Sequence, residues 1–319
     1  MMYDKYLKTN DSTFNRLQKI EFADRSFPYS FLSIPRLDRC QNKDLFIIVL
    51  TTVDAFERRQ EIRRTWAQSK HLEKTVVSFV VGVNDTSKQL ERFHREVRQH
   101  RDVIWAEISD IYELLVVKVL VAFTAYQRYC NDVPFVLKVD DDVAVIPDRL
   151  VYHLNTSLTE NKDNAIYGQA WFKSKVKRDP KSKWYVSPDT YKPFLYPTYV
   201  NGPAYLLTSR AVTEILRKTH LVNFLSMEDA LLTGIVADKA GVKVINKPEI
   251  FKFECSSVLG RIRAVGEWPE TYRADHCLKT HGECDQSGVP KASILTHDPM
   301  TPPLNMSLFY TSLLDVKCG

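Results

Sequence analysis

The run Phe135-Val136-Leu137-Lys138-Val139-Asp140-Asp141-Asp142 is mostly apolar and ends in three consecutive carboxylates. Valine-rich runs of this length, bounded by prolines, are typical of a strand buried on both faces of a parallel sheet. Side chains alternate along a strand, so we expect Asp140 and Asp142 to point one way and Asp141 the other. Ligands of open α/β sheets bind beyond the carboxyl ends of the strands, so this triplet marks the expected site.

A divalent cation is the expected partner of the triplet, because three adjacent anions are costly unless something neutralises them. Mn²⁺ and Mg²⁺ prefer oxygen ligands and keep coordination positions for water or phosphate. The alternative is a plain acidic turn that leads into Val143-Ala144-Val145. We favour the metal site, since an apolar strand that ends in three acids is a poor way to build a loop.

The residues before the triplet alternate between strand and helix patterns. Their expected strands are Leu45–Thr51, Thr75–Gly82 and Val103–Glu107, and their expected helices are Phe56–Gln68, Ser87–Gln99 and Ile111–Tyr129. This order indicates βαβ units and a mainly parallel sheet flanked by helices. The chain has no GxGxxG or P-loop fingerprint, so neither a dinucleotide nor a Walker-type ATP site is indicated.

The two ends of the chain are less regular. Residues 1–39 lack sustained periodicity and are interpreted as a stem or docking arm, with folding expected to start near Cys40. After residue 165 the pattern changes to short strands and loops, with helices expected at Ser209–Lys218 and Met227–Ala240.

Composition limits the class of protein. The 319 residues are 44% hydrophobic and can form one large domain or two closely packed ones. A formal net charge of +5 gives no strong nucleic-acid signal and is compatible with an anionic ligand.

Cysteines and glycosylation sequons both indicate an oxidising lumen. The six cysteines are an even set with 15 possible pairings, and the four sequons exceed the one or two expected by chance. The cysteines are Cys40, Cys130, Cys255, Cys277, Cys284 and Cys318, and the sequons begin at Asn10, Asn84, Asn155 and Asn305. Residues 1–44 contain no apolar anchor, so either an anchor precedes this start or the chain stays in the cytosol.

Two further charged segments are candidates for chemistry. Glu228-Asp229 follows Ser226 and precedes an apolar run, which indicates a capped helix start, and a carboxylate there also suits a general base. Arg59 and Arg63 share one face of the first helix. They either form a solvated basic face or hold phosphate or lock an acidic loop.

Three other motifs have structural and functional interpretations. Tyr196-Pro197-Thr198-Tyr199, leading into Gly202, is either a buried turn or an aromatic platform for a sugar or base. The basic run between Lys173 and Lys183 is interpreted first as a mobile solvated loop, and otherwise as a lid or a contact for an acidic acceptor. For the segment His276-Cys277 to His281-Cys284 we favour a disulfide loop over zinc, because the spacing lacks a paired cysteine half-site.

Together, six motifs between residues 59 and 230 resemble those of the inverting β-1,3-glycosyltransferases, the galactosyl- and N-acetylglucosaminyltransferase family to which the Fringe enzymes are related. Arg59-Gln60-Glu61-Ile62-Arg63-Arg64-Thr65-Trp66 resembles R-x-x-I-R-x-T-W, and Lys138 to Asp142 matches K-x-D-D-D. The other matches are Phe79 to Gly82, Asp110 to Lys118, Tyr196 to Tyr205 and Glu228-Asp229-Ala230. Leu114 and Ala204 replace the usual Asn and Gly.

The resemblance implies a GT-A fold, a UDP-sugar donor and Mn²⁺, or Mg²⁺, as the metal. Asp142 is then the principal metal ligand, with Asp140 and His297 as further ligands. Asp229 is the general base for the acceptor hydroxyl. The donor-binding residues implied are Arg59, Arg63, Lys138, Asp140, Asp141 and Gly202.

These assignments imply a metal-dependent inverting transferase that moves a hexose to a glycan acceptor in β-1,3 linkage, on a glycoprotein, glycolipid or proteoglycan. Residues 40–319 would form the catalytic domain, with a nucleotide-sugar half at 40–145 and an acceptor half at 146–319. The family implies a type II membrane protein of the Golgi lumen, whose anchor this chain lacks. An inactive metal- and UDP-sugar-binding module of the same fold is the alternative.

Overall fold

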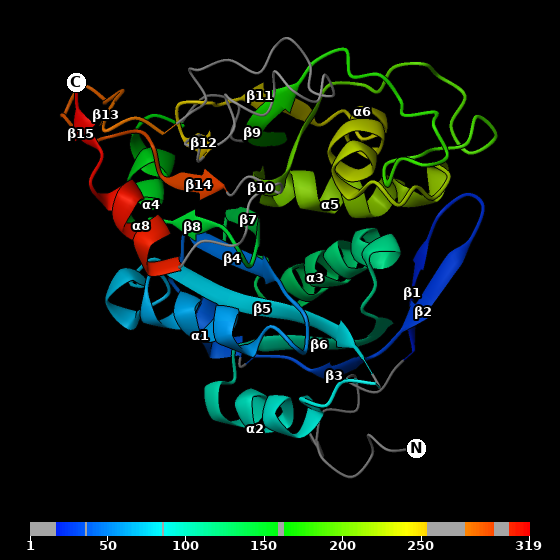
Figure 1. The fold of residues 1–319 in the computed structure, drawn as a ribbon, viewed down its shortest axis with the longest axis horizontal. Coiled ribbons are helices and arrows are strands. Elements are labelled where there is room, and N and C mark those ends of the chain that lie inside the picture. The colour runs from blue at the N-terminus through cyan, green and yellow to red at the C-terminus, as the bar shows by residue number, and fades with distance from the viewer. Residues whose placement is uncertain (1–16, 36, 85, 159–162, 254–277, 297–305) are drawn as a thin grey trace.

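The computed structural model describes residues 17–35, 37–84, 86–158, 163–253, 278–296 and 306–319. Its main sheet contains β3 (Phe31–Ser33), β4 (Leu45–Leu50), β5 (Thr75–Val83), β6 (Val103–Ser109), β7 (Phe135–Asp140), β9 (Ala165–Trp171), β10 (Tyr199–Thr208) and β11 (Lys243–Asn246). These eight strands are ordered β11-β9-β10-β7-β4-β5-β6-β3 (Figure 1).

The sheet is mixed and mainly parallel, as the sequence predicts. Strands β7, β4, β5 and β6 run parallel to one another, and so do β9 and β11. Every residue of β4 is buried, which explains why the sequence of this central strand is a continuous apolar run. Strand β10 is antiparallel to both of its neighbours, so β7 lies where the parallel part of the sheet meets an antiparallel strand.

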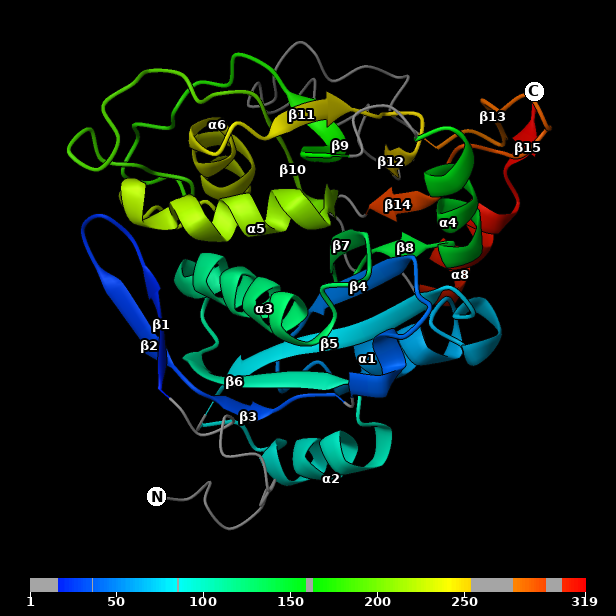
Figure 2. The same cartoon turned by 180° about the vertical axis from the view of Figure 1, so that it is seen from behind.

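Helices pack on both faces of the main sheet, and the sheet divides the core into two clusters (Figures 1 and 2). They are α1 (Phe56–Arg64), α2 (Leu90–His100), α3 (Leu115–Tyr129), α4 (Pro147–Thr156), α5 (Ser209–Lys218), α6 (Ala237–Lys239) and α8 (Met306–Leu314). Helices α3, α5 and α6 contribute to one cluster, while α1, α2, α4 and α8 contribute to the other. The expected helices at Phe56–Gln68, Ser87–Gln99 and Ser209–Lys218 are therefore confirmed, with small shifts at their ends.

Helix α3 is the longest of the described helices, is mostly apolar and is buried in the core. Its first expected turn forms a separate 3₁₀ turn at Tyr112–Leu114. In the part of the chain that the structure describes, no helix combines the length and apolarity needed to cross a bilayer.

The segment before Cys40 contains more regular structure than its sequence indicates. Strands β1 (Gln18–Glu21) and β2 (Ser26–Tyr29) form a hairpin, drawn in blue at the edge of Figure 1. Strand β3 then pairs antiparallel with β6 and supplies the outer strand of the main sheet. The expectation that folding starts near Cys40 is thus wrong for residues 17–33, because strands of three or four residues are too short to show a period.

A smaller sheet follows directly on the acidic triplet. Its strands are β12 (Phe251–Phe253), β14 (Ile294–Thr296) and β8 (Ala144–Val145), in that order. Because β8 pairs with β14, the chain that leaves the triplet is fixed to the C-terminal part of the fold. The acidic triplet is therefore more than a plain turn, because it connects β7 of the main sheet to β8 of the smaller sheet.

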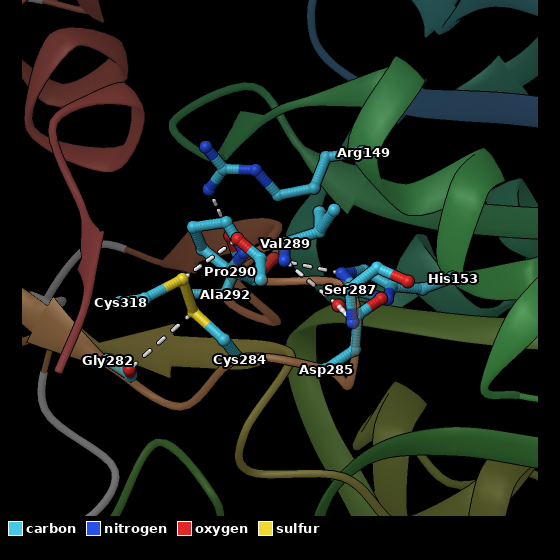
Figure 3. Close-up of a disulfide and its surroundings, with 11 residues drawn as sticks. Arg149, His153, Gly282, Cys284, Asp285, Ser287, Val289, Pro290, Ala292 and Cys318 are labelled. Atoms are coloured by element: carbon cyan, nitrogen blue, oxygen red, sulfur yellow. Dashed lines mark hydrogen bonds between the residues drawn. A yellow bond between two sulfur atoms is a disulfide. The ribbon is translucent and has the colours of Figure 1, made fainter.

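Two disulfides connect distant parts of the described chain, in agreement with the expected oxidising compartment. Cys40 is joined to Cys130 at the end of α3. Cys284 is joined to Cys318 beside β13 (His281–Gly282) and β15 (Lys317–Cys318), as Figure 3 shows. The Cys284 thiolate is therefore not available to zinc, and the disulfide interpretation of this segment holds for that residue. Cys255, Cys277 and His276 lie outside the described residues.

Helix α4 holds this C-terminal segment through two side chains (Figure 3). Arg149 Nη1 donates to the carbonyl of Ala292 at 2.7 Å, and His153 Nε2 lies 2.9 Å from the carbonyl of Pro290. Both contacts are long-range in sequence, so α4 and the disulfide together fix the polypeptide that leads into β14.

Candidate active site

The site lies where β7 ends and β10 begins. Because the two strands are antiparallel, the middle of β10 lies beside the last residues of β7: Ala204 pairs with Val139, and Tyr205 pairs with Lys138. The pairing of β10 with β9 shifts register between Val200 and Tyr205, which is a bulge that contains Gly202. This arrangement brings Gly202 to the Asp140 end of β7.

Lys138 connects the two strands at this point. Its side chain is 1% exposed, and its Nζ donates to Asp140 Oδ1 and to the Gly202 carbonyl, each at 2.7 Å. Glu228 Oε2 lies 3.7 Å from the same ammonium. Burial acts to lower the pKa of Lys138, but Asp140 and Glu228 outweigh it and raise the pKa above its usual value. Lys138 is thus a permanent cation between the triplet and the Glu228-Asp229 pair.

Asp229 lies against the bulge. Its Oδ1 accepts from the Ala230 amide at 2.8 Å, and a Cβ added at Gly202 would lie 3.3 Å from its Oδ2. The helical segment begins at Glu228, so Met227 rather than the expected Ser226 is at the N-cap position, and the segment is π-helical over Ala230–Val236. Burial raises the pKa of Asp229, which makes the carboxylate a stronger base.

Thr233 connects the helical segment to β10 and to the backbone of Asp229, and so holds Asp229 in place. The Val200 amide donates to Thr233 Oγ1 at 3.1 Å, and Thr233 Oγ1 donates to the Asp229 carbonyl at 2.7 Å. A Cβ at Gly234 would lie 3.0 Å from Tyr199 Cβ, so the small residue permits this close approach. A π-helical turn is common at functional sites.

Glu228 is a structural partner of the site. Its side chain is buried, and it accepts from the Tyr205 hydroxyl. Burial raises the pKa of Glu228 to about 7, although Lys138 acts in the opposite direction. Two adjacent carboxylates therefore have different roles: Glu228 is held by a tyrosine and a lysine, while Asp229 faces the bulge.

The triplet separates into different environments, as strand alternation predicts. Asp140 is paired with Lys138, its side chain is 36% exposed, and burial raises its pKa. Asp141 is buried and points to the opposite side, where it accepts from Arg58 Nη1 at 2.6 Å and from Thr51 Oγ1 at 2.7 Å. Asp142 is partly exposed. Asp141 is therefore used for structure, and Asp140 and Asp142 remain at the accessible edge.

Arg59 and Arg63 do not lie at that edge. Arg59 is fully buried, with Nε and Nη2 donating to the two carboxylate oxygens of Glu96 at 2.8 and 2.7 Å. Arg63 contacts Glu96 and also binds both oxygens of Asp102, at 2.9 and 2.8 Å. Their guanidinium groups are committed to acids on α2 and at the start of β6, so the phosphate-binding interpretation is not supported by this geometry. They hold α2 and the residue before β6 against α1, so the interpretation that they lock an acidic loop applies only to Arg63 and Asp102.

Arg58, their neighbour, is the arginine that reaches the triplet. It was missed because a helix pattern alone does not show which of four arginines faces the sheet edge. Thr51 was missed for a similar reason. Thr51 ends the β4 region, donates to Asp141, and its carbonyl accepts from Lys118. Lys118 also donates to Asp110 Oδ1 at 2.6 Å, so the Asp110 to Lys118 motif supports the same strand end.

The aromatic turn is buried. Tyr196, Tyr199 and Tyr205 are 4%, 8% and 0% exposed. Tyr196 stacks on Tyr191, with ring centroids 5.4 Å apart. The structural interpretation of this turn is therefore correct, and the platform interpretation is not supported for these three rings.

The described residues include two accessible carboxylates suited to a divalent ion. Asp140 and Asp142 supply hard oxygen donors at a strand end, which is the donor set that Mn²⁺ and Mg²⁺ accept together with substrate phosphates. Within the described ranges no group of three or more His, Cys, Asp or Glu side chains forms a complete ligand set. His297, the third expected ligand, lies outside the described residues.

Comparison with known proteins identifies the family. A family model described as galactosyltransferase matches residues 57–248, which include the triplet, the bulge and Asp229. The chain belongs to the galactosyltransferase family. It is therefore a hexosyltransferase, and the resemblance of its motifs to the β-1,3-glycosyltransferases is confirmed.

Three relatives of this transferase illustrate the family. β-1,3-galactosyltransferase bre-2 of Caenorhabditis elegans is 26% identical, over 74% of this chain and 68% of that protein. Lactosylceramide 1,3-N-acetyl-β-D-glucosaminyltransferase A of Danio rerio is 30% identical, over 68% of this chain and 59% of that protein. β-1,3-galactosyltransferase 1 of Mus musculus is 28% identical, over 75% of this chain and 74% of that protein.

Among solved structures, mouse xyloside xylosyltransferase 1 aligns with a TM-score of 0.42 at 12% identity, covering 81% of this transferase and 99% of that chain.

Proposed function

We propose that this transferase moves a hexose, galactose or an N-acetylhexosamine, from a UDP-sugar to the 3-hydroxyl of a glycan acceptor with inversion to the β linkage. The observation that carries the proposal is the Lys138 ammonium, which joins Asp140 of the triplet to the Gly202 bulge against which Asp229 lies. This contact supports the proposal, because Asp140 and Asp229 lie at one sheet edge, and a direct displacement needs the donor phosphates and the base close together.

Asp229 is the proposed general base. As the acceptor oxygen forms its bond to the anomeric carbon, the bond between that carbon and the UDP oxygen breaks, and the acceptor proton passes to the Asp229 carboxylate. The Ala230 amide donates to Oδ1, and Oδ2, which lies on the Gly202 side, is the proposed proton acceptor. Inversion follows from attack opposite the leaving group and needs no covalent enzyme intermediate.

Asp142 and Asp140 are the proposed ligands of Mn²⁺ or Mg²⁺, with His297 as a further candidate. When bound, the ion would neutralise charge that develops on the leaving diphosphate. Lys138 contributes a fixed positive charge beside Asp140, which limits the repulsion between donor phosphates and the acidic triplet.

The proposed compartment is the Golgi lumen, with the full-length protein a type II membrane protein. The disulfides Cys40–Cys130 and Cys284–Cys318 support an oxidising compartment. An exposed sequon asparagine at residue 155 on α4 is compatible with glycosylation there.

The test is UDP release from a panel of UDP-sugars with a pool of β-linked acceptors, measured with and without Mn²⁺. We compare the wild type with Asp229→Asn and with Asp238→Asn, which removes an exposed carboxylate on α6. We expect Mn²⁺-dependent release from one donor, lost by at least about 10²-fold in Asp229→Asn and retained in the control. Donor binding should survive in Asp229→Asn.

Two results would contradict the proposal in different ways. Near-normal turnover in Asp229→Asn would remove the base assignment. Mn²⁺-dependent UDP binding by calorimetry without turnover on any acceptor would favour an inactive binding module of the same fold.

A further inference from the structure

The positive charge of this chain is concentrated in one segment, residues 172–195, between β9 and β10. The segment contains six lysines and one arginine against two aspartates, a net charge of +5. The whole chain also has a formal net charge of +5, so the other residues are formally neutral. Figure 1 shows this segment as a long green tube without helices or strands, extending beside α6.

The segment has an internal framework of hydrogen bonds. Arg178 donates to the carbonyls of Val186 at 2.7 Å, Tyr191 at 2.6 Å and Pro193 at 2.8 Å. The Val176 amide donates to the Phe194 carbonyl at 2.9 Å. The arginine is thus used inside the segment, while the lysines remain at its surface. The exposed lysines are Lys173, Lys175, Lys181, Lys183 and Lys192.

Lys183 stands out among these lysines because of the rings beside it. Its Nζ lies 5.5 Å from the centroid of Tyr112 and 5.2 Å from the centroid of Trp184. The side chain of Tyr112 is 51% exposed. Its pKa is raised by burial first and by the negative charge of Asp229 second. No carboxylate of the described residues forms an ion pair with Lys183. An exposed ammonium therefore lies on two aromatic rings, and one of these rings, Tyr112, is close enough to Asp229 for that charge to raise its pKa.

We propose that the acceptor of this transferase carries an anionic group, a carboxylate or sulfate, on or next to the accepting sugar, and that Lys183 binds it while Tyr112 and Trp184 contact the sugar. The inference rests on the proposed function and adds the acceptor class. Aromatic faces bind the apolar face of a sugar ring, and a lysine held over them provides a point charge for an acid group. The remaining lysines extend the positive surface for a longer anionic glycan.

The first test compares two disaccharide acceptors that differ only by one acid group, a neutral β-hexoside and its 6-O-sulfated or uronic acid form. We expect the wild type to have a higher kcat/KM for the anionic acceptor than for the neutral one. The difference should come from a lower KM and not from a higher kcat. Lys183→Gln should reduce this preference about tenfold, and Lys183→Arg should restore most of it. Lys239→Gln, an exposed lysine on α6, should leave the preference unchanged. Separate sulfate and carboxylate arms identify which acid is recognised.

A binding test does not depend on turnover. Tryptophan fluorescence is titrated with each disaccharide in the wild type, Lys183→Gln and Lys239→Gln. Saturable binding of the anionic form that weakens about tenfold in Lys183→Gln alone supports the inference even if no donor is found, whereas absent binding overturns it. If the anionic disaccharide binds but no UDP is released from any donor, the result counts against the proposed function and not against the acceptor inference.

A membrane surface is the competing partner of such a basic segment. Sedimentation with vesicles that contain anionic lipid, compared with neutral vesicles, distinguishes the two. Vesicle binding that depends on the lysines, together with equal use of neutral and anionic acceptors, would overturn the acceptor inference in favour of a lipid headgroup.

Discussion

Arg58 Nη1 lies 2.6 Å from Asp141 Oδ1, so the middle acid of the triplet is neutralised by helix α1 and not by a ligand. This pair separates the roles of three neighbouring residues. Asp141 connects the end of β7 to α1 and to Thr51, while Asp140 and Asp142 stay at the accessible edge.

Asp141→Asn and Asp142→Asn should therefore have different effects. Asp142→Asn should abolish Mn²⁺-dependent UDP binding with little change in stability. Asp141→Asn should lower the free energy of unfolding by about 1–3 kcal/mol, because a buried acceptor of two hydrogen bonds is altered, and keep metal-dependent binding. Calorimetry and urea unfolding measure the two properties. Equal loss of binding in both variants would contradict the separation.

Glu96 should be critical for stability. Its carboxylate neutralises the fully buried Arg59 and also contacts Arg63. Glu96→Ala leaves a guanidinium buried without its partner and should cost about 3–5 kcal/mol of unfolding free energy. Glu61→Ala removes a partner of the exposed Arg64 and should cost less than about 0.5 kcal/mol. A similar small cost in both variants would show that the Arg59 network is dispensable.

Glu228 should make the protein less stable as the pH rises. Its pKa is raised from 4.5 to about 7 in the folded protein, so the native state binds more protons than the unfolded chain between these values. Stability is therefore greatest below the unfolded pKa and is lost as pH rises through the folded pKa, by at most about 3 kcal/mol. Urea unfolding of Glu228→Gln should show a correspondingly smaller decline across this interval. Parallel curves for the two proteins would argue against the assignment.

Gly202→Ala should impair turnover more than donor binding. The added Cβ would lie 3.3 Å from Asp229 Oδ2, so the carboxylate must move by a few tenths of an ångström. We expect kcat to fall about tenfold, since a small displacement of a catalytic group is costly. Ala204→Gly, two residues away in the same bulge, removes an atom and should retain kcat. Unchanged kcat in Gly202→Ala would place the reacting oxygen elsewhere.

The sequence predicted the central strands and most helices because buried parallel strands are continuous apolar runs and amphipathic helices repeat with a clear period. Strand β7 and the alternation of Asp140 and Asp141 follow from such local rules. The partners of Arg59 did not follow, because Glu96 lies on α2, and only tertiary packing brings α1 and α2 together. The candidate site residues Lys138, Gly202 and Asp229 were selected from motifs, but their connection through one ammonium required the structure.

Other errors had equally physical causes. Strands β1 to β3 are too short for a period of two to be visible, and their pairing partner β6 lies far along the chain. The antiparallel placement of β10 next to β7 cannot be read from either strand alone. The helix expected at Met227–Ala240 is present from Glu228 onward, but its π-helical stretch at Ala230–Val236 could not be read from the apolar pattern.

The bulge in β10 allows one strand both to pair with the sheet and to line the space next to Asp229. The pairing with β7 starts at Ala204 and the pairing with β9 resumes at Tyr205, while residues 201–203 are in register with neither strand. Substitutions in this stretch can change the contour next to Asp229 without shifting the sheet. A family built on this strand can therefore diversify its substrates by small changes at one point, while the scaffold that folds the protein stays the same.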